Sequence, residues 1–153
     1  MPYPKAFFAT ANEHERPGTC FVLMPFATGF DTTYDAILDA MESADLVFRC
    51  RRADELFGGH EIMEGVLQEI ARAEVVIADL TGRNPNVFYE LGIAHMLKDA
   101  DRVLLLTQSV EDVPFDLRSY RCIVYGTDES GLRLLRRKLS EAAREIVGNC
   151  YRF

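Results

Sequence analysis

Short apolar runs alternate along the chain with segments whose apolar residues recur at helical spacing. The runs have the length of buried strands and lie at residues 20–24, 45–50, 75–78, 103–106 and 121–125. The segments with helical spacing lie at residues 34–41, 62–73, 87–97 and 132–146, and the last of them is charged and amphipathic. Because strands buried on both faces alternate with helices in parallel sheets, this pattern predicts an α/β fold.

The predicted architecture is a flavodoxin-like three-layer sandwich around a five-stranded parallel sheet. Right-handed crossovers favour the strand order 2-1-3-4-5, which places a switch point between the first and third strands. Residues 113–119 support only a short helix or a loop between the fourth and fifth strands. Residues 1–18 are expected to form a flexible N-terminal arm, and residues 19–153 a single domain.

Composition and charge narrow the classes of partner. The 153 residues are 48% hydrophobic and 27% charged, and the net charge of −7 argues against a broad surface for a nucleic acid polymer. The apolar runs are too short to span a membrane, and no signal peptide is evident. The four cysteines form no CxxC pair and have no metal-ligand spacing with histidine. This indicates reduced thiols, no metal site and a cytoplasmic location.

Three turns are expected to meet beside the switch point, where ligands of open α/β sheets bind. The first turn carries Met24, Pro25 and Phe26, and the other two span residues 49–54 and 79–86. An aromatic ring, several arginines and several carboxylates therefore come together at one crevice. This arrangement predicts a pocket for a small polar molecule.

Two carboxylates near the third strand are the candidates for chemistry. Glu90 shares a helix face with Asn86 and could attack an electrophilic carbon to form an ester, as acids of retaining glycosidases do. Alternatively, Glu90 only complements the helix dipole. Asp79 ends the strand and could bind a sugar hydroxyl or orient a base, or it could cap the turn through backbone N–H groups.

The polar turn between these acids carries Arg83 and two asparagines. Asn84 is expected to be a helix N-cap, because Pro85 suits a first helical position. Asn86 is expected to point into the pocket. His95, further along the same helix, is expected to be a satisfied helix histidine rather than a catalyst.

Arg52 and Asp54 follow the second strand. In dinucleotide-binding folds, an acid at this place binds ribose hydroxyls and a nearby arginine accepts phosphate. The glycine fingerprint of those folds is absent after the first strand, which argues against a standard Rossmann site. The arginines at residues 49–52 could equally be a solvated strand end, and Phe26 could stack on a base or lie in the core.

Residues 21–26 (FVLMPF) and 78–95 (ADLTGRNPNVFYELGIAH) resemble the nucleoside 2-deoxyribosyltransferase-like superfamily, and more closely its bacterial TIR-like branch. The resemblance covers roughly residues 20–125. It implies that Glu90, in a Glu-x-Gly-x-Ala segment, is the nucleophile or an acid that stabilises an oxocarbenium ion. Thr81 stands where the transferases carry the aspartate that handles the departing base, and Asp79 lies two residues earlier.

The resemblance also implies a function: cleavage of an N-glycosidic bond, by hydrolysis or transfer, in a nucleotide or NAD-type substrate, without a cofactor. Nicotinamide leaves NAD⁺ without protonation, so one glutamate can suffice there. The expected site has Glu90 and Asp79 as catalytic residues, and its substrate-binding residues are Met24, Pro25, Phe26, Arg52, Asp54, Asn84 and Asn86. A homo-oligomer is expected, because the transferases often complete their site from a neighbouring subunit. The alternative is a non-catalytic nucleotide-sensing or self-assembling domain.

Overall fold

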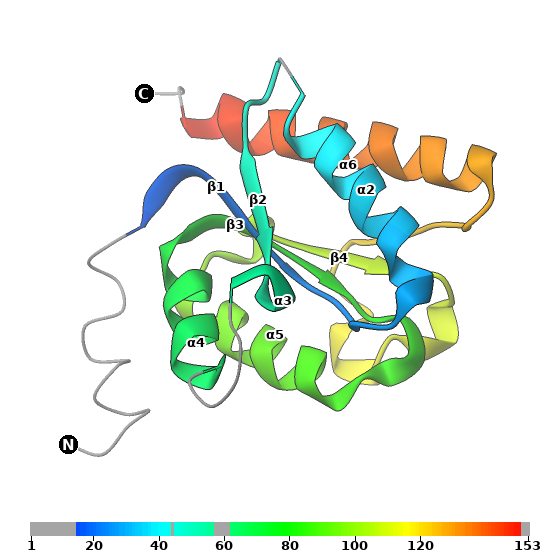
Figure 1. Ribbon diagram of the computed structural model, residues 1–153, viewed down its shortest axis with the longest axis horizontal. Coiled ribbons are helices and arrows are strands. Elements are labelled where there is room, and N and C mark those ends of the chain that lie inside the picture. The colour runs from blue at the N-terminus through cyan, green and yellow to red at the C-terminus, as the bar shows by residue number, and fades with distance from the viewer. Residues whose placement is uncertain (1–14, 44, 57–61, 151–153) are drawn as a thin grey trace.

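Five parallel strands form one sheet in the computed structural model, which describes residues 15–43, 45–56 and 62–150 (Figure 1). The strands are β1 (Arg16–Leu23), β2 (Arg49–Arg52), β3 (Ala73–Asp79), β4 (Val103–Thr107) and β5 (Cys122–Val124). Their order is β2-β1-β3-β4-β5, and each neighbouring pair is parallel. The predicted α/β fold and strand order are therefore confirmed.

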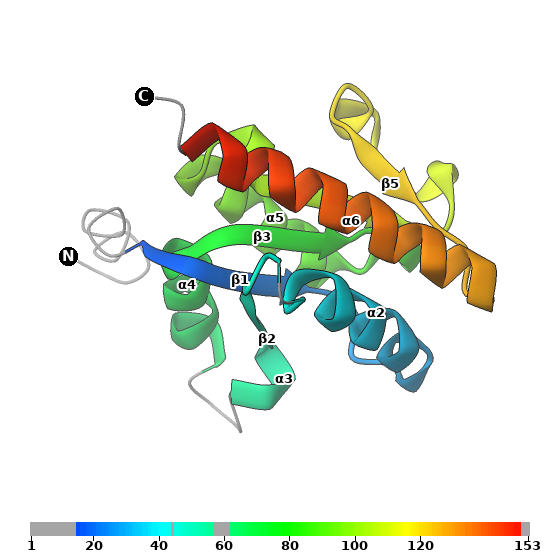
Figure 2. The same cartoon turned by 90° about the horizontal axis from the view of Figure 1, so that it is seen from above.

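Helices cover both faces of the sheet, as Figure 2 shows from above. One face carries α2 (Asp31–Met41) and α6 (Glu129–Cys150), and the other carries α4 (Ile62–Arg72) and α5 (Pro85–Leu97). Alternate residues of β3 belong to the two separate cores: Val75 and Ile77 pack with α2 and α6, whereas Val76 and Ala78 pack with α4 and α5. This burial on both sides explains why β3 is a continuous apolar run.

The second strand lies later in the chain than residues 45–50, where it was predicted. Leu46 and Val47 instead form a turn in which both N–H groups donate to the carbonyl of Ser43, and Val47 is exposed with φ 55°. β2 is an edge strand of four residues in which exposed and buried positions alternate. An edge strand tolerates charged side chains, so the apolar run was the wrong signal for its position.

β1 begins at Arg16, four residues before the predicted start. Arg16 pairs with Ala73 of β3, and the register shifts before Cys20. Gly18 has φ 73°, and its N–H donates to Glu74 Oε2 at 2.5 Å. Residues 16–18, which were assigned to the N-terminal arm, thus belong to the strand, and residues 1–14 lie outside the described part of the chain.

The connection between β4 and β5 contains only two single-turn 3-10 helices, η5 (Val110–Asp112) and η6 (Phe115–Leu117), as predicted for a short helix or a loop. A one-turn helix, α3 (Ala53–Leu56), follows β2.

Cys20 and Cys50 are register partners on β1 and β2, and both are buried free thiols. None of the helices in the described ranges is long and apolar enough to cross a membrane.

Candidate functional site

Asp79, the last residue of β3, is completely buried and hydrogen-bonded within the protein. Its Oδ1 accepts from the N–H of Thr81 at 3.0 Å and from the Thr81 hydroxyl at 2.6 Å. Its Oδ2 accepts from the hydroxyl of Tyr125 at 2.5 Å. Burial raises the pKa of Asp79 above its ordinary value, although the hydrogen bonds from Thr81 and Tyr125 oppose that rise. Of the two roles left open by the sequence, the contacts match turn capping.

Tyr125, which follows β5, is a site residue that sequence reasoning missed. Its hydroxyl also accepts a hydrogen bond from Gln108 Nε2 at 3.1 Å, and the backbone N–H of Gln108 donates to the Thr81 hydroxyl at 2.9 Å. Burial and the nearby Asp79 carboxylate raise the pKa of Tyr125 to about 12, so the phenol stays a donor. Its only signal in the sequence was its place directly after a strand, and β5 lies at the sheet edge away from the switch point between β1 and β3.

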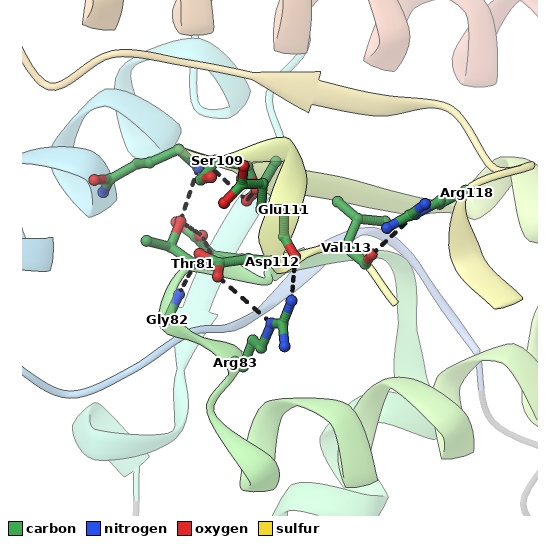
Figure 3. A network of polar contacts seen from close by, with 11 residues as sticks. Thr81, Gly82, Arg83, Ser109, Glu111, Asp112, Val113 and Arg118 are labelled. Atoms are coloured by element: carbon green, nitrogen blue, oxygen red, sulfur yellow. Dashed lines mark hydrogen bonds and ion pairs between the residues drawn. The ribbon is translucent and has the colours of Figure 1, made fainter. Parts of the chain in front are cut away.

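A second network fixes the turn after β3 against η5, as Figure 3 shows. The N–H of Gly82 donates to Asp112 Oδ2 at 2.8 Å, and Arg83 Nε lies 3.7 Å from Asp112 Oδ1. The Arg83 guanidinium also donates to the backbone carbonyl of Glu111. Gly82 and Arg83 both have positive φ, 77° and 55°, in η3 (Thr81–Arg83). Arg83 is therefore held by η5 and does not join Arg52 or Asp54.

Asn84 is the N-cap of α5, as predicted. Its side-chain oxygen accepts from the N–H of Asn86 at 2.9 Å and of Val87 at 3.4 Å, and Pro85 opens the helix. The Asn84 side-chain oxygen is therefore engaged by the helix cap and is not available to accept a hydrogen bond from a ligand. Asn86 is exposed, so its side chain stays open to solvent and to a ligand.

Glu90 is the sixth residue of α5 and differs from every other carboxylate in the site. It is largely buried, and the structure gives it no hydrogen bond or ion pair with any described residue. Burial alone raises the pKa of Glu90 from 4.5 to about 7. The helix dipole acts mainly within the first turn, so complementing the dipole does not account for this residue. Both protonation states of Glu90 are populated near neutral pH.

Arg52 and Asp54 lie together at the end of β2 and bind each other. The distance from Arg52 Nε to Asp54 Oδ1 is 2.7 Å, and a second carboxylate, on Asp31, lies 3.6 Å from the guanidinium. The guanidinium stacks 4.3 Å from the centre of the Tyr34 ring, and its side chain is only 11% exposed. Arg52 is therefore an ordered, mostly buried cation at the place where the sequence predicted phosphate binding.

The turn after β1 divides between core and surface. Met24 is buried and its sulfur lies 3.8 Å from the Arg52 guanidinium, whereas Pro25 is half-buried. Phe26 is 61% exposed, which excludes the core alternative and leaves its ring free to stack.

His95 stacks on Tyr120 with ring centres 5.0 Å apart, and burial lowers the pKa of this histidine.

The structure thus gathers the predicted residues in two groups. Asp79, Asn84, Asn86 and Glu90 follow one another in the β3–η3–α5 unit. Beside β2, Arg52 contacts both Met24 and Asp54. No hydrogen bond or ion pair joins the two groups among the described residues. Within residues 15–43, 45–56 and 62–150, no cluster of three or more His, Cys, Asp or Glu side chains could hold a metal ion.

Comparison of the chain with models of known protein families gives no match, and comparison with curated protein sequences gives none. The resemblance to the transferase-like superfamily therefore remains a prediction from the two motifs.

Proposed function

We propose that the protein cleaves the N-glycosidic bond of a nucleotide or NAD-type substrate, with Glu90 as the nucleophile. One observation carries the proposal: Glu90 is a largely buried carboxylate with no described partner and a pKa of about 7. A buried carboxylate with a structural role is normally paired with a cation or accepts hydrogen bonds, as Asp79 does here. A carboxylate kept without such partners is typical of groups that react.

The reaction follows from the chemistry of a desolvated carboxylate. Ionised Glu90 attacks C1′ of the ribose, the bond between C1′ and the base nitrogen breaks, and the base departs with the electron pair. The resulting ester is then released by water in a hydrolase or by a second base in a transferase. Because nicotinamide in NAD⁺ already carries the positive charge that cleavage neutralises, that leaving group requires no general acid.

The neighbouring residues supply binding in this proposal. The exposed ring of Phe26 stacks on a base, Arg52 binds the phosphate, and Asp54 binds the ribose hydroxyls. Asp79 acts as a positioning residue, because its hydrogen bonds to Thr81 and Tyr125 hold the turn from which α5 begins. The motif match at Glu90 supports the same assignment.

A second candidate function is a nucleotide-sensing or self-assembling domain without catalysis. Two observations favour it: Arg52 and Asp54 already neutralise each other, and several large apolar side chains are exposed. The most exposed of these are Met96 and Phe115, at 85% and 82%. Side chains of this kind suit association between copies, so we include homo-oligomerisation in this proposal.

Release of the base distinguishes the two functions. The purified protein is incubated with NAD⁺ and with ribo- and deoxynucleosides and their 5′-nucleotides, and free base is measured by chromatography. We expect Glu90→Gln to lower the rate by at least about a thousandfold. Glu111→Gln, which removes an exposed carboxylate of η5, is the matched control and should keep full activity.

The pH dependence tests the role of Glu90 more sharply. A nucleophile must be ionised, so the rate should rise as the pH passes through about 7 and level off above it. A rate that falls above pH 7 would instead make Glu90 a general acid. Absence of base release from every substrate, with a size-exclusion shift on addition of nucleotide, would overturn the glycosidase proposal in favour of the sensor.

A further inference from the structure

A cavity of about 380 Å³ lies at the end of the sheet opposite to the candidate site. It opens where β1, β2 and β3 begin, and four arginines line it: Arg16, Arg49, Arg51 and Arg72. We propose that this cavity is an anion site that binds a chain of two or three phosphates.

The fold brings these four arginines together from three separate segments. Arg49 and Arg51 alternate along β2 and therefore project from the same face of this edge strand. In the neighbouring strand, Arg16 opens β1 and pairs in register with Ala73. Arg72 ends α4 immediately before Ala73, so it reaches the same end of the sheet.

None of the four guanidinium groups has an ion pair or hydrogen bond with another described residue. The lining includes one carboxylate, on Glu69. The Glu74 carboxylate lies beside the cavity, because its Oε2 accepts from the N–H of the lining residue Gly18, but it forms no ion pair with the four arginines. Among the residues that line the cavity, positive charges exceed negative charges by three, which is unfavourable without an anion and stands out in a chain whose net charge is −7.

The arginines also indicate the class of anion. Guanidinium groups present paired donors that match the oxygens of phosphate. A single phosphate group carries about two negative charges near neutral pH, which four arginines exceed. A chain of two or three phosphates balances them better. This chemistry occurs in free polyphosphate and in a nucleoside triphosphate, and the exposed Val47 on the rim offers an apolar surface to a nucleoside.

This cavity lies at the opposite end of the sheet from Glu90. On β2, Arg51 of the cavity directly precedes Arg52, but the two side chains project from opposite faces of the strand. Asp79 is the last residue of β3 and Glu90 follows it in α5, whereas Ala73 begins the strand. A seven-residue strand spans about 20 Å, so one compact nucleotide does not reach both ends. The inference therefore does not depend on the glycosidase proposal.

The test is isothermal titration of the full chain with sodium tripolyphosphate at low ionic strength. We expect the wild-type protein to bind, with an affinity that falls as salt is added. Arg49→Gln with Arg51→Gln should weaken binding by about a hundredfold, because each of the two lost charge-assisted hydrogen bonds is worth roughly tenfold. The matched control, Arg133→Gln with Arg137→Gln, makes the same change in net charge on exposed positions of α6 and should keep the wild-type affinity.

Further arms identify the source of the phosphates and separate this site from catalysis. Equal affinity for tripolyphosphate and ATP would indicate recognition of the phosphate chain alone, whereas tighter binding of ATP would indicate a nucleotide ligand. Glu90→Gln should leave tripolyphosphate binding unchanged. Because the strand variants could alter folding, thermal unfolding of each is compared with that of the wild type.

Three results would overturn the inference. The first is no binding of tripolyphosphate by folded wild-type protein, which would leave the arginines as charges that protect an edge strand. The second is an equal loss of affinity in the α6 control. The third is a dimer, detected by light scattering, that Arg49→Gln with Arg51→Gln dissociates while tripolyphosphate has no effect on it.

Discussion

Replacing Glu90 by glutamine is expected to stabilise the protein at alkaline pH and to have little effect at acidic pH. Burial raises the pKa of Glu90 from 4.5 to about 7, so the native state binds this proton more tightly than the unfolded chain does. The stability that Glu90 contributes is therefore fully present below about pH 4.5 and is lost as the pH rises through about 7. Glutamine has nearly the same shape and does not ionise, so the variant avoids that loss.

The two pKa values set the size of the effect. Their difference corresponds to at most about 3–4 kcal/mol in the free energy of unfolding. Glu90 is partly exposed, and contact with water reduces this value to about 1–2 kcal/mol. The variant should therefore be more stable than the wild type by about this amount above pH 7, and the difference should vanish towards pH 4.5.

Urea unfolding followed by circular dichroism measures this difference at a series of pH values. Glu111→Gln serves as the control, because it makes the same chemical change at an exposed carboxylate outside α5. The reasoning is refuted if the gap between Glu90→Gln and the wild type does not depend on pH. It is also refuted if the variant is the less stable protein above pH 7, since Glu90 would then have a stabilising partner.

Two further substitutions test the structural part of the site. Tyr125→Phe removes the hydroxyl that donates to buried Asp79 at 2.5 Å, so we expect a loss of about 1.5–3 kcal/mol in urea unfolding and a higher pKa for Asp79; unchanged stability would contradict the hydrogen bond. Asn84→Ala removes the N-cap of α5 and should cost about 1 kcal/mol, whereas Asn84→Asp keeps an acceptor and should cost little; equal losses in both variants would show that the cap is not the cause.

Elements that are buried on both faces could be located from the sequence. β3 and β4 are continuous apolar runs because helices cover both sides of them, and few structures other than a buried strand fit such a short run. The N-cap at Asn84 could also be predicted, because a cap depends on residues within one turn. β2 could not, because an edge strand needs only one buried face and three of its four residues are arginine.

Some properties of the candidate site could also be predicted from the sequence, and others depend on tertiary packing. The sequence determined that Asp79 ends a buried strand and that Glu90 lies early in the following helix, since both properties are local. Only the tertiary structure decided that Asp79 is satisfied by Tyr125, 46 residues away, whereas Glu90 is largely but not fully buried and has no described partner. It likewise separated Arg52, which is paired with Asp54, from Arg49 and Arg51, which line the arginine-rich cavity and have no ion pair with another described residue. The pKa and reactivity of a side chain depend on burial and on partners from distant segments, and those are set only when the chain packs.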